Sequence, residues 1–241
     1  MKGWVRILAG CLVVAMALGA GTAQALDIDA IDAGWYDLSG LHNAANTAYP
    51  AGFDGTYEAR DFFIFDIDSA IGTITAAQLV LYEPGNGYSS PDPSETLTIT
   101  APIAYSPGTI ATGHGAGDSE GQAIWADLAA ATQIGSTDIT ASTIGEIVID
   151  LDASILPAIM ASAGSQWAAG GYLYSYSGEI DQNEYVLSDT FDWPGDPTIP
   201  APILRLTTGD TPPPPPVIPE PATLALLGGA LLGLARRRRR K

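Results

Sequence analysis

The sequence predicts an all-β protein, in which a jelly-roll-like β-sandwich with short crossover helices forms the body of the chain. In the body, apolar and polar residues alternate at every second position in short segments, and Gly, Pro, Asn and Asp separate these segments. The chain's one cysteine, Cys11, lies near the N-terminus, so the body has no disulfide. Short strands without disulfides are typical of two packed sheets, which bury one face of each strand.

Seven segments are predicted as strands from this alternation: residues 61–68, 76–82, 96–101, 146–151, 171–176, 184–187 and 203–207. The first segment is apolar on both faces in its middle, where Phe62, Phe63, Ile64 and Phe65 follow one another. We therefore expect a strand that is covered on both sides, with carboxylates where it ends.

Two stretches have helical spacing instead. Residues 123–131 are rich in alanine, which favours a short helix. The second helix is expected after Asp152, with Asp152 or Ser154 as its N-cap and Gly164 at its end.

Residues 1–25 have the three zones of a secretory signal peptide: a basic start, an apolar stretch and small residues at a cleavage site. Ala23 and Ala25 form the A-x-A site, which places the mature start at Leu26. Cys11 resembles a lipid-acceptor cysteine, but most of the apolar stretch follows it, and lipidation requires that stretch to come first.

The predicted ectodomain, residues 26–209, is followed by a proline-rich stalk, residues 210–216. A proline run favours an extended, semi-rigid spacer. The last segment, residues 217–241, contains the triplet Pro219, Glu220 and Pro221, then 14 largely apolar residues, then a basic cluster. The basic cluster consists of Arg236, Arg237, Arg238, Arg239, Arg240 and Lys241. As a helix the apolar run is short for a membrane span of about 20 residues, and the basic cluster would stay cytoplasmic.

The order of triplet, short apolar helix and arginine cluster resembles a PEP-CTERM sorting signal. This resemblance implies a Gram-negative bacterium in which the export machinery carries the chain to the inner membrane. There the tail serves as a transient transmembrane anchor until an exosortase cleaves it. It also implies delivery to the cell surface or extracellular matrix, often in bacteria that secrete exopolysaccharide. The alternative is a plain C-terminal membrane anchor.

The body also resembles a recurring ectodomain of PEP-CTERM proteins. The resemblance lies in the FFxFD motif of residues 62–66, the strand at 74–82 and the SPDPSET loop of residues 90–96. It supports a sandwich fold and implies no activity.

Charge excludes one class of partner. Residues 26–216 hold two basic residues, Arg60 and Arg205, against 26 acidic ones, a net charge of −24. So acidic a body is repelled by the phosphates of nucleic acids, and no nucleic-acid partner is expected.

The residue inventory gives little support to an enzyme. No cysteine remains after processing, and His42 and His114, the only histidines, lie in loop-like stretches where we expect surface residues. Carboxylates are too numerous for any one pair to indicate catalysis. We therefore predict no enzymatic activity, and a glycan-cleaving enzyme remains a distant alternative.

Two binding hypotheses remain open. Asp66 and Asp68 follow one strand, and Asp150 and Asp152 follow another, so these four could bind a structural calcium ion. Aromatic residues, including Trp35, could present flat faces to sugars. Tyr172, Tyr174 and Tyr176, which alternate along one predicted strand, are the main candidates. The leading interpretation is a structural or adhesive ectodomain, and the alternative is a carbohydrate-binding module for exopolysaccharide.

Overall fold

The computed structural model describes residues 23–175, 183–187 and 199–209. The predicted stalk and sorting tail, Tyr176 and most of the predicted signal peptide lie outside these residues.

All the strands pair in antiparallel fashion. They are β1 Gln24–Asp37, β2 Ala51–Phe53, β3 Glu58–Ile67, β4 Thr73–Glu83, β5 Glu95–Thr100, β6 Gln133–Ile139, β7 Gly145–Asp150, β8 Ser165–Leu173, β9 Glu184–Val186 and β10 Ile203–Gly209. Each of the seven predicted strands overlaps one of these, whereas β1, β2 and β6 were not predicted. The overlap is smallest for the predicted strand at 171–176, which shares only residues 171–173 with β8.

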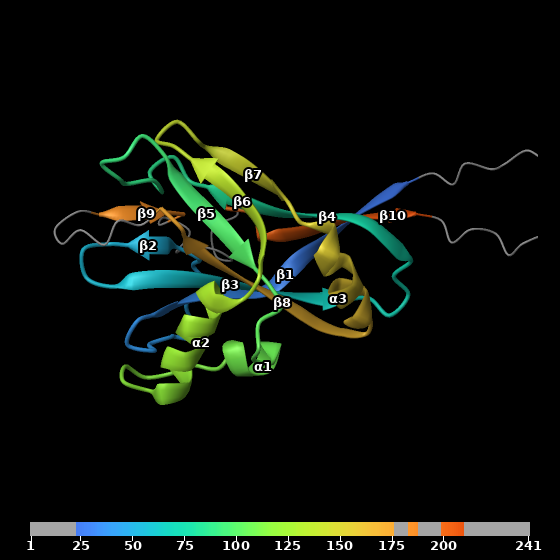
Figure 1. Ribbon diagram of the computed structural model, residues 1–241, viewed down its shortest axis with the longest axis horizontal. Helices are drawn as coiled ribbons and strands as arrows, with labels where there is room; N and C mark the ends of the chain where they lie inside the picture. Colours follow the sequence, from blue (N-terminus) through green and yellow to red (C-terminus); the bar gives the residue numbers. More distant parts are fainter. Residues whose placement is uncertain (1–22, 176–182, 188–198, 210–241) are drawn as a thin grey trace, which may run out of the picture.

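The strands form two layers that are joined at one corner (Figure 1). One layer has the order β1-β10-β4-β7, and the other has the order β3-β8-β5-β6, with β2 and β9 added beside β3. Each layer mixes strands from the first and second halves of the chain, and this alternation is the connectivity of a jelly roll. The predicted fold class is therefore confirmed.

Strand β1 joins the two layers. Its first half pairs with β10 and its second half pairs with β3, with a bulge between Ala30 and Asp32. On the opposite side β6 and β7 approach each other, and the Asp152 N–H donates a hydrogen bond of 2.6 Å to the Ile134 carbonyl. The sheet is thus nearly closed.

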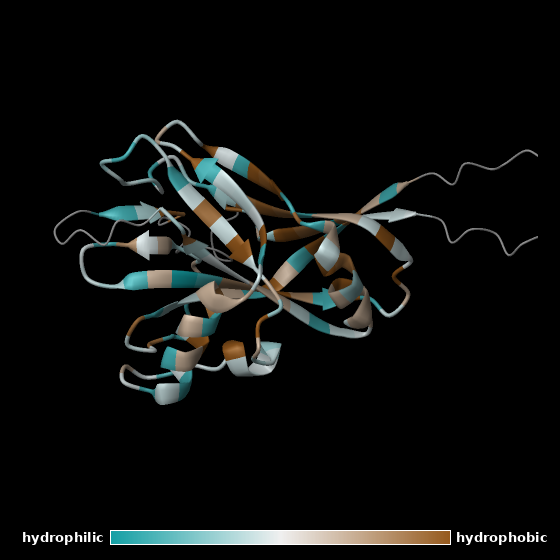
Figure 2. Ribbon diagram, viewed as in Figure 1, coloured by the Kyte–Doolittle hydropathy of each residue, from teal (hydrophilic) through white to brown (hydrophobic). Residues whose placement is uncertain are grey.

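The main core lies between the layers and includes Phe63, Phe65 and Leu79. A second core lies outside β3, where Phe62 and Ile64 are covered by two helices, α1 Pro107–Ile110 and α2 Ser119–Ala130. Strand β3 is therefore buried on both faces, as predicted. Figure 2 shows the alternation of apolar and polar residues along β5.

Helices α1 and α2 and the turn before α3 begin at side-chain caps. Asp118 caps α2 by accepting hydrogen bonds from two backbone N–H groups of the first turn, at 2.8 and 3.0 Å. Of the two candidate caps for the second predicted helix, Asp152 is the one used. It precedes a 3-10 turn, η1 Ala153–Ile155, and then α3 Leu156–Ala161.

The chain enters and leaves the sandwich at the same end (Figure 1). The first residue of β1, Gln24, lies opposite Thr208 near the end of β10. The other end is formed by the last residues of β1, by β2 and β9, and by the start of β3. We call it the distal end.

Candidate functional site

Four buried carboxyl groups lie at the distal end of the sandwich interior: Asp61, Glu83, Glu95 and Glu184. Strand alternation places each on the same face as residues of the main core, for example Asp61 with Phe63 and Phe65. The two basic residues of the body lie elsewhere, so no guanidinium of the described residues offsets these groups.

Each of two interior glutamates accepts hydrogen bonds. Glu95 accepts from the hydroxyls of Ser90 and Ser175, and Glu83 accepts from the Leu187 N–H at 3.0 Å. Asp61 differs, because neither of its oxygens has a hydrogen-bond partner among the described residues. Burial raises the pKa of Asp61 well above its usual range, so this carboxyl tends to keep its proton.

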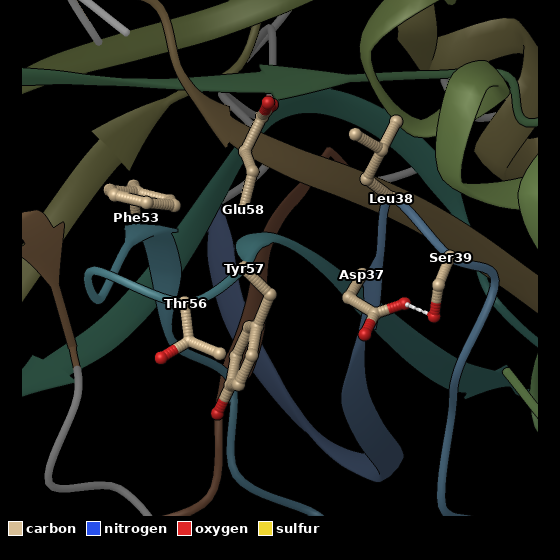
Figure 3. Close-up of a pocket in the computed structure, with 7 residues that line it drawn as sticks. All are labelled: Asp37, Leu38, Ser39, Phe53, Thr56, Tyr57 and Glu58. Atoms are coloured by element: carbon tan, nitrogen blue, oxygen red, sulfur yellow. Dashed lines mark hydrogen bonds between the residues drawn. The ribbon is translucent and has the colours of Figure 1, made fainter. Parts of the chain in front are cut away.

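An open pocket of about 440 Å³ lies at the distal end (Figure 3). We call it the distal pocket, and its lining residues are Asp37, Leu38, Ser39, Phe53, Thr56, Tyr57 and Glu58. They come from the end of β1, the end of β2, the turn after β2 and the start of β3. Three segments therefore meet here, where an Asp54-Gly55 turn reverses the chain.

Local hydrogen bonds hold both carboxylates of the distal pocket. Asp37 Oδ1 accepts from the Ser39 hydroxyl at 2.6 Å, as Figure 3 shows, and from the Leu41 N–H at 2.9 Å. Glu58 Oε1 accepts from Arg60 Nε at 3.1 Å. Each carboxylate is thus fixed in position, and a carboxylate has more acceptor sites than these hydrogen bonds occupy.

An aromatic stack supports one wall of the distal pocket. The rings of Tyr57 and Trp35 are 4.9 Å apart and nearly parallel, at 4°. Burial is the main cause that raises the pKa of Tyr57, so its phenol is neutral near pH 7. The stack gives the pocket a flat and rigid apolar surface.

Both basic residues of the body are already paired. The Arg60 guanidinium lies 3.4 Å from the centre of the Trp125 ring and donates to the Trp125 carbonyl as well as to Glu58. Arg205 forms a two-pronged ion pair with Asp27, with distances of 2.9 and 3.1 Å. Neither offers a free cationic surface.

The structure does not bring the four predicted calcium ligands together. Asp66 and Asp68 end β3 in one layer, whereas Asp150 accepts a hydrogen bond of 2.7 Å from Gln78 in the other, and Asp152 caps η1. In the described part of the chain, no three His, Cys, Asp or Glu side chains gather as a metal site. Calcium binding by these residues stays a prediction.

The three tyrosines predicted to bind sugar are placed only in part. Tyr172 is half-buried on β8, Tyr174 is 72% exposed just beyond the strand, and Tyr176 lies outside the described residues. From the sequence, Trp35 was named among the aromatic residues that could bind sugars, but Tyr57 and the distal pocket were missed. The Asp54-Gly55 turn was the one local signal that could have indicated a hairpin there.

The prediction that His42 and His114 are surface residues was wrong. Both are buried, with exposed fractions of 4% and 9%, because their loops fold back over Tyr36. Burial lowers the pKa of His42 to about 4, and its Nδ1 lies 3.0 Å from the Trp35 carbonyl. We read these residues as part of the packing around Tyr36.

The C-terminal segment is identified by comparison with known families. Residues 217–240 match the family model of the PEP-CTERM protein-sorting motif, and this match includes the triplet Pro219 to Pro221. The chain is therefore one that carries a PEP-CTERM sorting motif, which supports export, processing by an exosortase and transient anchoring through the C-terminus. No curated protein matches the chain. Within the described ranges, no helix combines the length and apolar character that crossing a membrane requires.

Proposed function

We propose that this protein is displayed at the cell surface or in the extracellular matrix, and that its jelly-roll body acts there as a non-catalytic adhesive or structural domain. One observation carries the proposal: β1 and β10 are neighbours, so the chain leaves the body at the end where it enters. A tail attached after Gly209 would hold that end towards the membrane. The distal end would then face outwards.

The chemistry of the described residues supports a non-catalytic role. Burial raises the pKa of Asp61 well above its usual range, and such a shift often marks a catalytic acid. It is fully buried and lines none of the distal pocket. A group that substrate does not reach is better explained as part of the folded interior.

Sorting can be tested in a Gram-negative host that has an exosortase. The full chain, with an epitope inserted at the exposed Ser142, would be compared with a variant in which Pro219, Glu220 and Pro221 are replaced by alanine. The variant should keep its tail and stay in the inner membrane. A matched control replaces Pro212, Pro213 and Pro214, which alters the stalk alone. Normal tail removal and surface delivery in the triplet variant would refute the proposed sorting.

Adhesion can be tested separately on the same cells. Processed wild-type protein should stay with the washed cell–matrix fraction, and a chain in which residues 26–209 are replaced by an unrelated folded domain should be released. Equal retention of the two would show that the body contributes nothing to attachment.

A carbohydrate-binding role is the second candidate. The observation in its favour is Tyr174, a large aromatic residue that is 72% exposed. Retention of exopolysaccharide by the protein should fall in a Tyr174→Ala variant if this residue contacts the glycan.

A further inference from the structure

We propose that the distal pocket is a binding site for a neutral glycan, with Tyr57 as the surface on which a sugar ring stacks. The inference rests on the proposed function in one respect, namely that the distal end faces outwards. It names a different site from Tyr172, Tyr174 and Tyr176, because the pocket is built from β1, β2 and β3.

The first argument is the geometry of the aromatic wall. Tyr57 lines the pocket, and Trp35 stacks on its ring at 4.9 Å with an angle of 4°. One face of the tyrosine is thereby covered and its orientation is fixed. The apolar C–H face of a sugar ring can pack against such a flat surface.

The second argument is the set of hydrogen-bonding groups. Asp37 is oriented by Ser39 and Leu41, and Thr56 adds a hydroxyl. The Glu58 carboxylate points away from the Tyr57 ring (Figure 3), so it contributes charge to the pocket and no contact to the stacked sugar. Carboxylates accept hydrogen bonds from sugar hydroxyls, and a threonine hydroxyl can both donate and accept. Because these groups are held before a ligand arrives, binding orders fewer side chains and loses less entropy.

The third argument is charge, which selects the class of glycan. Two carboxylates line the distal pocket, and the nearby Arg60 is engaged with Glu58 and with the Trp125 ring. A uronate or sulfate group would be repelled by the carboxylates without gaining a free cation. The surrounding body, with its net charge of −24, adds to this repulsion. A polysaccharide of uncharged hexoses meets no such barrier.

The full-length chain in mild detergent can be titrated calorimetrically with hexasaccharides of defined charge. The neutral probes are cellohexaose, laminarihexaose and isomaltohexaose, and the anionic probe is a mannuronate hexamer. We expect at least one neutral probe to bind and the anionic probe to bind at least tenfold more weakly. Absence of binding by all three neutral probes at millimolar concentration, or tighter binding of mannuronate, would overturn the proposal.

Variants locate the binding. Tyr57→Ala should weaken binding of the neutral probe at least tenfold, whereas Ile144→Ala, an exposed control outside the distal pocket, should leave it unchanged. If Tyr57→Ala does not fold, Tyr57→Leu keeps an apolar contact with Trp35 while removing the flat ring, and the same loss is expected. Unchanged affinity in a folded Tyr57 variant would refute this site. Sorting is tested by tail removal in cells, and glycan binding is tested by calorimetry. Failure of either proposal therefore leaves the other one testable.

Discussion

His42 and His114 exchange both of their backbone hydrogen bonds, at 3.0 and 2.9 Å, and thereby join the loop after β1 to the loop before α2. Their rings pack against Tyr36, whose hydroxyl donates a hydrogen bond of 2.7 Å to the Ile110 carbonyl. This contact closes the second core beneath the helices.

Acidification should weaken this contact through His42. Its pKa is lowered from 6.5 to about 4, so the folded state binds this proton less readily than the unfolded state. The contribution of neutral His42 to the free energy of unfolding is present above pH 6.5. As the pH falls towards 4, this contribution is lost, by on the order of 2–3 kcal/mol. His42→Asn should be less stable at pH 7 but lose less stability between pH 7 and 4.5, as measured by urea unfolding. Equal losses of stability between pH 7 and 4.5 in wild type and variant would contradict the assignment of this pH dependence to His42.

Asp61 should have the opposite pH dependence. Burial raises the pKa of Asp61, so the protonated carboxyl contributes to folding stability below about pH 3.8. This contribution to stability is lost as the pH rises from there through the raised pKa. Asp61→Asn should therefore unfold at a higher urea concentration than wild type at pH 8, with a gain of about 1–3 kcal/mol. The two proteins should converge at pH 3.5. The control is Asp66→Asn, an exposed position on the same strand, which should show no comparable pH-dependent gain.

Helix α2 depends on a close approach to β8 at Gly170. A Cβ atom at this position would lie 2.9 Å from Leu128 Cδ2 and 3.0 Å from the Leu128 carbonyl oxygen. Because that oxygen also accepts a hydrogen bond from Thr100, the helix end cannot move away freely. Gly170→Ala should cost about 1–3 kcal/mol in urea unfolding. Gly115→Ala, where a Cβ atom meets nothing within 4 Å, should be close to neutral.

Local sequence patterns predicted seven of the described strands. Strand β3 is the clearest case, since its apolar residues lie on both faces and both faces are covered. Strand β1 escaped prediction because its bulge shifts the core-facing positions by one, from Ala30 to Ala33, and leaves Ile31 48% exposed. The exposed apolar Ile31 and the polar Asp32 between these positions interrupt the alternation that would indicate a strand.

The candidate site was predictable only where it is a linear motif. The sorting signal is contiguous, so its triplet, apolar run and basic cluster could be identified directly from the sequence. The distal pocket joins residues from three segments, and the pairing of β3 with both β1 and β2 brings them together. The burial of His42 likewise depends on a contact with the distant His114, which no local pattern encodes.

The predicted signal-peptide cleavage can be tested against the pairing of β1 with β10. A chain that starts at Leu26 loses the two outermost register pairs, those of Gln24 and Ala25, and keeps the Asp27–Arg205 ion pair. Recombinant Leu26–Gly209 should therefore melt within a few degrees of Ala23–Gly209. Failure of the shorter chain to fold would place the cleavage upstream of Leu26.

Removing the whole first half of β1 should have a much larger effect. A chain that starts at Asp32 loses every β1–β10 pair, including the backbone partners of Leu204 and Leu206, which are fully buried in the main core. Strand β10 would become an unpaired edge and expose core side chains to water, so unfolding or aggregation is expected. Size-exclusion chromatography and thermal melting distinguish these outcomes from a folded monomer. A monomer that melts at the wild-type temperature would contradict the role of β1 in joining the two layers. It would show that β10, β4 and β7 stay folded without pairing to β1.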